Sequence, residues 1–212
     1  MSKLTISRRG ILGSIIATGA SLGVAKASDK KTVTPPHTEG PFYPITSQAD
    51  KDADLTQIAG RTETAIGTPI IVEGQIFDDD GRPIPNAVVD IWQANAAGRY
   101  AHEADPNTAP LDPNFQSWAI MKTDGEGRYR FKTVKPGAYP VTDDWSRPPH
   151  IHFKVSRRGF REITTQMYFE GEALNDVDQL LNELPLKMRP TLIAQQKDSN
   201  APFKFDVVLA KV

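Results

Sequence analysis

From Pro69 to the C-terminus, runs with the length and composition of β-strands recur at intervals of roughly ten residues, with turn residues between them. The runs cover residues 69–77, 86–94, 117–124, 128–134, 150–156, 163–169 and 203–210. A Gly-Glu-Gly turn at 125–127 predicts a hairpin between the third and fourth runs, and helical spacing is confined to residues 175–184. The pattern therefore predicts an all-β fold, a sandwich or barrel with few short helices and long functional loops.

Length and composition limit the partners of the chain. Its 212 residues fit one domain with appendages, which is enough for a hydrophobic core. A formal net charge of -1 gives no electrostatic reason to expect nucleic acid or an acidic membrane surface as a partner. Cysteine is absent, which excludes disulfides, thiolate ligands and a cysteine nucleophile. Small molecules and proteins remain, and any metal must be bound through nitrogen and oxygen.

Residues 1–27 have the features of an export signal. Paired arginines at 8–9 precede an apolar stretch over about 11–24, and an A-x-A cleavage pattern follows at 25–27. The stretch is short for a membrane-spanning helix and rich in small residues. The arginines favour twin-arginine export, and hence a periplasmic or secreted bacterial protein; an ordinary secretory signal and an uncleaved anchor are the alternatives.

The next segment, residues 28–68, is polar and predicts an extended N-terminal arm before a catalytic or binding domain at 69–212. Its distinctive run is TPPHTEGPFYP at 34–44, where repeated prolines disfavour regular helix. Phe42 and Tyr43 would be poor residues in a free linker. We therefore expect the arm to lie over another part of the protein.

A pair of histidines stands out in the run at 150–156, because the chain has only four histidines. Side chains alternate along a strand, so His150 and His152 share one face while the apolar residues between them share the other. Such a pair can give two nitrogens to one metal. It is also common as a solvent-facing pair, so the motif alone leaves both interpretations open.

Two tyrosines strengthen the metal hypothesis. Tyr139 lies between a Pro-Gly pair and a further proline that restrict its backbone, and Tyr100 follows a strand run and a glycine turn. Two phenolates and two imidazoles would form an N2O2 site, and hard phenolate oxygen favours ferric iron. Zinc would more often recruit a third histidine or a carboxylate. We interpret Tyr129 and Tyr168 as structural residues of the core.

Five segments resemble the intradiol ring-cleavage dioxygenases in order and near-spacing, most closely the iron-bearing (beta) subunit of the protocatechuate enzymes. They are residues 72–100, 111–115, 124–140, 147–155 and 164–171, so the similarity covers about residue 69 to the C-terminus. The resemblance implies a prealbumin/transthyretin-like β-sandwich. It also implies an enzyme that inserts both atoms of O2 into a catechol-type aromatic, of the protocatechuate, catechol or hydroxyquinol class, to form a cis,cis-muconate.

The same resemblance assigns residues to the site. It implies that a non-haem Fe(III) is bound by four ligands, Tyr100, Tyr139, His150 and His152. Of the two tyrosines, Tyr139 would be displaced when substrate chelates, while Tyr100 would stay. Arg147 would lie beside the substrate ring and stabilise its developing charge. Gln166 matches a residue that helps to position substrate or dioxygen.

The chain also departs from the family pattern. Val141 stands where the protocatechuate enzymes have a tryptophan, and the helical N-terminal dimerisation domain of catechol enzymes is missing. The run at 34–44 looks like the arm of the iron-free partner subunit, so the arm could complete the pocket within one chain or between identical subunits. We expect a homo-oligomer, with a hetero-oligomer as the alternative. Arg99 and Arg128 are candidates for binding a substrate carboxylate.

Two other functions remain to be weighed against the dioxygenase. A catalytically silent transthyretin-like carrier or binding module would keep the scaffold without needing the four ligands and Arg147. A cupin-like site or a zinc hydrolase would contain zinc or copper and consume no oxygen. The joint presence of all the ligands favours the dioxygenase.

Overall fold

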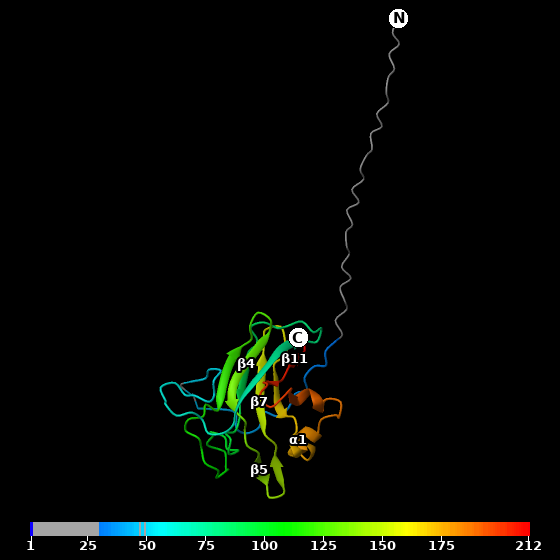
Figure 1. Ribbon diagram of the computed structural model, residues 1–212. Helices are drawn as coiled ribbons and strands as arrows, with labels where there is room; N and C mark the ends of the chain where they lie inside the picture. The colour runs from blue at the N-terminus through cyan, green and yellow to red at the C-terminus, as the bar shows by residue number, and fades with distance from the viewer. Residues whose placement is uncertain (2–29, 47, 49) are drawn as a thin grey trace.

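The computed structural model describes residues 1, 30–46, 48 and 50–212 (Figure 1). The expected export signal, beyond Met1, lies outside these residues. All of the predicted strand runs are strands, although the last of them is split in two. These confirmed strands are β1 (Pro69–Asp78), β2 (Val88–Trp92), β3 (Trp118–Lys122), β4 (Arg128–Val134), β7 (His150–Ser156), β8 (Ile163–Phe169), β10 (Phe203–Lys204) and β11 (Val207–Leu209).

Three further strands were not predicted from the sequence: β5 (Tyr139–Thr142), β6 (Trp145–Arg147) and β9 (Ile193–Gln196). The first two pair only with each other and form a hairpin that projects from the body of the molecule, labelled at β5 in Figure 1. This hairpin contains a proline and exposed polar residues in place of alternating apolar residues, so it has no strand signature.

The other strands form a mixed nine-stranded sheet in the order β11-β1-β10-β9-β8-β7-β2-β3, with β4 paired to β1. Strand β7 lies antiparallel between β2 and β8, which places His152 opposite both Trp92 and Gln166. The two histidines are therefore held on an inner strand of the sheet, where both backbone edges are hydrogen-bonded.

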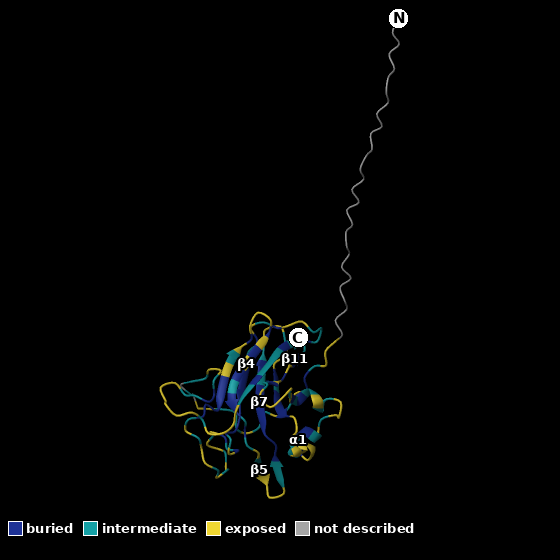
Figure 2. Cartoon of the chain, viewed as in Figure 1, coloured by how far each residue is buried: buried dark blue, intermediate teal, exposed yellow. Residues whose placement is uncertain are grey.

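The sheet folds over on itself into two layers. Strands β4 and β7 are not paired, yet the ring centroids of Phe131 and Phe153 lie 6.1 Å apart, and Phe153 also lies 5.0 Å from Phe205. Ile151, Phe153 and Val155 of β7 are fully buried in this core, which is the dark blue interior of Figure 2. The predicted alternation in β7 is thus present, because its histidines point to the opposite face.

The predicted hairpin at 125–127 is wrong. Strand β3 pairs with β2, whereas β4 pairs with β1, so the Gly-Glu-Gly turn carries the chain from one layer to the other. Thr123 anchors the start of the crossing, since its hydroxyl donates to the carbonyl of Ile84 and accepts from the amide of Ala87. The turn itself is closed by backbone bonds from the Gly127 amide to the Asp124 carbonyl and from the Asp124 amide to the Arg128 carbonyl.

The helix predicted over 175–184 is also shorter than expected. The structure has a 3-10 turn, η1 (Ala173–Asp176), then one turn of helix, α1 (Gln179–Asn182), and a second 3-10 turn, η2 (Arg189–Leu192). Asp178 breaks the segment, because its carboxylate caps α1 by accepting from the amide of Leu181. Among the described residues, no helix has the length and apolar character needed to cross a membrane.

The N-terminal arm packs on its own chain, as expected. Thr34 exchanges hydrogen bonds with Val208, and the hydroxyl of Thr165 donates to the carbonyl of Pro35. Farther along, the hydroxyl of Tyr43 donates to Asp90 at 2.8 Å. The arm thereby reaches the same face of the sheet that carries the two histidines.

Candidate active site

Three of the expected ligands converge on one point. The Tyr100 hydroxyl lies 2.9 Å from Nε2 of His152 and 3.3 Å from Nε2 of His150. All three side chains are buried. Trp92 stacks on the ring of His152 at a centroid distance of 4.7 Å, which fixes the orientation of that imidazole.

The protonation of these groups follows from their surroundings. Nδ1 of His150 lies 2.7 Å from the carbonyl oxygen of Pro148, so Nδ1 carries the proton and the Nε2 lone pair faces Tyr100. Burial, with a contribution from the Arg147 guanidinium, lowers the pKa of both histidines well below the ordinary value. The imidazoles are therefore neutral, which is the form that binds metals.

The fourth expected ligand, Tyr139, lies beside this group. Its ring centroid is 5.7 Å from that of Tyr100 and 5.7 Å from that of His150. Burial raises the pKa of both tyrosines, most strongly that of Tyr100. With their pKa values raised the phenols are neutral, and a bound metal ion would favour their phenolate forms.

The loops that carry the two tyrosines are packed backbone against backbone. Gly98 has a φ of +81°, and a Cβ at this position would lie 2.3 Å from the carbonyl oxygen of Ala138. The amide of Gly137 donates to the carbonyl of Asn95 at 2.9 Å across the same contact. Tyr100 and Tyr139 are thus positioned relative to each other by a contact that leaves no room for side chains.

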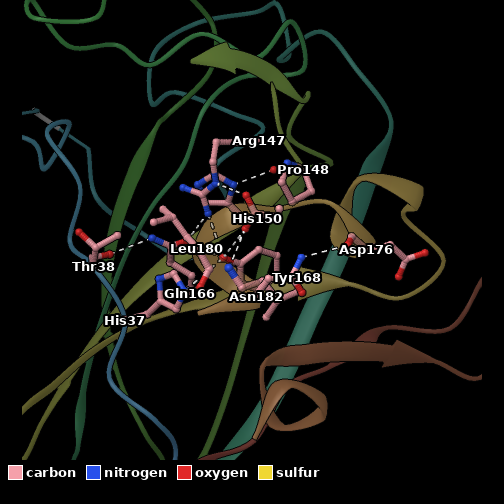
Figure 3. A network of polar contacts seen from close by, with 12 residues as sticks. His37, Thr38, Arg147, Pro148, His150, Gln166, Tyr168, Asp176, Leu180 and Asn182 are labelled. Atoms are coloured by element: carbon pink, nitrogen blue, oxygen red, sulfur yellow. Dashed lines mark hydrogen bonds and ion pairs between the residues drawn. The ribbon is translucent and has the colours of Figure 1, made fainter. Parts of the chain in front are cut away.

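Arg147 lies in a buried polar network next to His150 (Figure 3). Its Nε donates to Asp178 at 2.9 Å, and its Nη2 donates to Gln166 at 2.6 Å and to the Tyr168 hydroxyl at 2.9 Å. Tyr168 in turn donates to Asp178 at 3.2 Å. The ion pair and these bonds fix the plane of the guanidinium group.

The arm joins this network. The side-chain amide of Gln166 donates to the carbonyl of Thr38 at 2.8 Å, and Nε2 of His37 lies 3.2 Å from the carbonyl of Leu180. The ring of Phe42 packs on Tyr100 at a centroid distance of 4.8 Å. Arm, ligand loop and Arg147 network are therefore connected within one chain.

A pocket of about 600 Å³ opens in front of these residues. Three segments form most of its wall: the arm at 38–42, the loop at 105–108 and the β5–β6 hairpin. Tyr139, Arg147 and His152 line it, whereas Tyr100 and His150 lie behind the surface. A ligand in this pocket would therefore meet Tyr139 before Tyr100.

Comparison with known proteins shows the family of the chain. A protein-family profile described as Dioxygenase matches residues 38–210. The protocatechuate 3,4-dioxygenase beta chain of Burkholderia cepacia is 41% identical over 179 residues, which cover 80% of this chain and 76% of that one. The chain belongs to the intradiol dioxygenase family.

Other intradiol dioxygenases are also similar to this chain in sequence and in fold. The catechol 1,2-dioxygenase of Acinetobacter baylyi is 34% identical over 169 residues, covering 74% of this chain and 50% of that one. The chain spans about half the length of the catechol 1,2-dioxygenases that it matches. The solved dioxygenase domain of a carbohydrate-binding fusion protein from Streptomyces sp. SirexAA-E has a TM-score of 0.65 and 27% identity, covering 85% of this chain and 100% of that one. The predicted fold class is confirmed.

The non-haem ferric iron of the intradiol dioxygenase family fits the side chains present. The Tyr100 hydroxyl has a single proton, so it can donate to only one of the two imidazole nitrogens that face it. A cation at this point would be bound by all three groups. Two neutral imidazoles with hard phenolate oxygens form a donor set suited to ferric iron, and Tyr139 is near enough to complete it.

Neither candidate for binding a substrate carboxylate reaches the pocket. Arg99 donates to the carbonyl of Ala109 at 2.7 Å and is not part of the pocket wall. Arg128 pairs with Glu126 at 2.8 Å and lines a different hollow that shares no residue with this pocket. The structure therefore places neither arginine in the wall of this pocket.

Sequence reasoning missed several residues of the site. Asp178 was not singled out within the predicted helix, and Tyr168 was expected only as a core residue, yet both contact Arg147. His37 was noticed only as part of the arm. A buried arginine requires an acidic partner, and this is the signal that points to Asp178 once Arg147 is placed inside the protein.

Proposed function

We propose that the protein is a ferric intradiol dioxygenase that cleaves a catechol-type ring between its two hydroxylated carbons, with insertion of both atoms of O2, to give a cis,cis-muconate. In this proposal Tyr100, Tyr139, His150 and His152 bind the iron. The observation that carries it is the convergence of the Tyr100 hydroxyl with both histidine Nε2 atoms behind a pocket that Tyr139 and Arg147 line.

The position of each residue relative to the pocket indicates its role in the reaction. A bound ferric ion would supply Lewis-acid and redox chemistry toward a chelating diol. Tyr139 faces the pocket, so we assign it to accept a proton from a substrate hydroxyl, whereas buried Tyr100 keeps its place. Arg147 lies at the pocket wall and is oriented by Asp178, which suits it to stabilise negative charge on the ring.

Gln166 has an indirect role in this scheme. It is fully buried, is not part of the pocket wall, and bonds to Arg147 and to the arm. We therefore assign it to positioning Arg147 rather than to contact with substrate or dioxygen. The arm places Thr38, Gly40 and Phe42 in the pocket wall, so this chain contributes arm, loop and hairpin to one pocket. The protein is a homo-oligomer in this proposal, and a hetero-oligomer is the alternative because a relative is a beta chain.

The test is an assay of the purified single polypeptide after ferric reconstitution. Ferric tyrosinate absorbs visible light, so we expect a coloured protein that contains iron. We expect oxygen uptake with at least one of catechol, protocatechuate, hydroxyquinol and chlorinated catechols. A protein that stays colourless and consumes no oxygen with the whole panel would contradict the proposal and favour a silent carrier. Activity only after addition of a second subunit would contradict the single-polypeptide site.

We also propose that residues 1–27 direct twin-arginine export and are removed before Ser28. Support comes from the paired arginines at 8–9 and the A-x-A pattern at 25–27. Expressed at full length in a bacterium, the protein should be recovered outside the cytoplasm with Ser28 as its first residue. Replacing both arginines with lysine should retain it in the cytoplasm. Undiminished export of that variant would show that another route is used.

A further inference from the structure

We propose that the pocket selects catechols whose ring substituents carry no negative charge, and that Asp105 and Asp143 set this selectivity. The inference rests on the proposed dioxygenase function and names its substrate class. It also separates this chain from the protocatechuate enzyme to which it is similar, because protocatechuate carries a carboxylate on the ring.

The pocket has little positive charge to offer a carboxylate. Among the residues that line it, Arg147 is the one with a permanently charged side chain of positive sign, and no lysine is present. That charge is already balanced by Asp178, which is buried and 2.9 Å away. In the proposed function Arg147 also faces the charge that develops on the ring, so a carboxylate substituent would have to compete with both the ring and Asp178 for the same guanidinium group.

Acidic side chains line the pocket from two sides. Asp105 lies in the loop at 105–108, where its two oxygens accept from the amides of Tyr100 at 2.7 Å and Asn107 at 2.9 Å. These bonds fix its carboxyl group in the wall. Asp143 lies at the turn of the β5–β6 hairpin, is exposed, and forms no ion pair with any described residue. A carboxylate on the substrate would therefore enter between like charges.

The rest of the wall suits uncharged substituents. Apolar side chains come from each wall segment and from α1, namely Pro41, Phe42, Pro106, Pro140, Val141 and Leu180. The polar residues between them, such as Thr38, Asn107 and Thr108, are neutral. Hydrogen atoms, alkyl groups, halogens and amides on the ring can be accommodated here without loss of ionic hydration.

The experiment compares 3,4-dihydroxybenzoate with 3,4-dihydroxybenzamide, which match in shape and differ in charge at neutral pH. We expect kcat/KM for the amide to exceed that for the acid by at least about tenfold. The dissociation constant measured under nitrogen, where no turnover occurs, should also be lower for the amide than for the acid. Raising the ionic strength should narrow the preference, because exposed charges such as Asp143 are screened.

Variants of Asp143 test whether the charge is the cause. Asp143→Asn should reduce the amide-to-acid ratio by about two- to fivefold, and Asp143→Lys should reduce it further. The matched control is Asp198→Asn, in an exposed turn outside the pocket, which should leave the ratio unchanged. A ratio that stays the same in both Asp143 variants would refute the role of this residue.

Two outcomes separate this inference from the proposed function. If the acid is bound and cleaved as well as the amide, the inference is wrong while the dioxygenase proposal stands. If no catechol is bound or cleaved by the iron-loaded protein, both are wrong.

Discussion

Asp178→Asn is expected to destabilise the protein by about 3 kcal/mol, because it leaves the buried guanidinium of Arg147 without a balancing charge. Asparagine caps helices about as well as aspartate, so the hydrogen bond from the Leu181 amide is kept. The loss of stability can then be attributed to the lost negative charge. The loss should be visible as a lower midpoint in urea denaturation with little change in slope. Activity should also fall, since Arg147 loses its orienting partner.

Two controls make this prediction specific. Asp176→Asn changes an exposed aspartate two residues away and should leave the free energy of unfolding within about 0.5 kcal/mol of the parent. Combining Arg147→Met with Asp178→Asn removes both charges, so the pair should be more stable than Asp178→Asn alone. If the double variant is instead less stable than the single variant, an uncompensated charge is not the reason for the loss.

Replacing both His150 and His152 with alanine should abolish metal binding and activity. Together they supply the two nitrogens that face Tyr100, and the remaining phenols would have to bind a cation alone in a buried site. We expect iron affinity to fall by more than about 100-fold. Metal analysis after dialysis and the visible absorption of the protein measure the loss.

The control for this variant is His102→Ala. His102 lies in an exposed loop outside the pocket wall and accepts a hydrogen bond from the amide of Ala104. The variant should retain iron and colour. Full iron content in the His150/His152 variant, with circular dichroism like that of the parent, would refute the ligand assignment.

The strands of the core could be predicted because the alternation of apolar and polar residues marks them in the sequence. In β7, Ile151, Phe153 and Val155 face the core while the histidines face away, and this alternation is visible in the sequence. Pairing between strands has no such local signal. The turn at 125–127 has the composition of a hairpin, yet β3 and β4 join different layers, because their partners are chosen by packing across the whole sheet.

In the candidate site, too, some residues could be predicted from the sequence and others could not. Tyr100, Tyr139, His150 and His152 could be proposed because their side-chain chemistry and a family resemblance both pointed to a metal. Their supporting residues come from distant parts of the chain with no shared motif. Asp178 contacts Arg147 across 31 positions, and Thr38 contacts Gln166 across 128. Only the folded arrangement brings such residues together.

The origin of the pocket wall has a consequence for how this protein can change over evolution. The candidate ligands are held by an inner strand and by two loops locked together at Gly98. Most of the wall instead comes from the arm, the loop at 105–108 and the β5–β6 hairpin, all of them outside the nine-stranded sheet. Mutations at wall positions other than Tyr139 and Arg147, which begin and end the hairpin, can alter the accepted ring substituents without replacing a group of the reactive centre. Substrate preference can therefore change during evolution while the groups that carry out the reaction are kept.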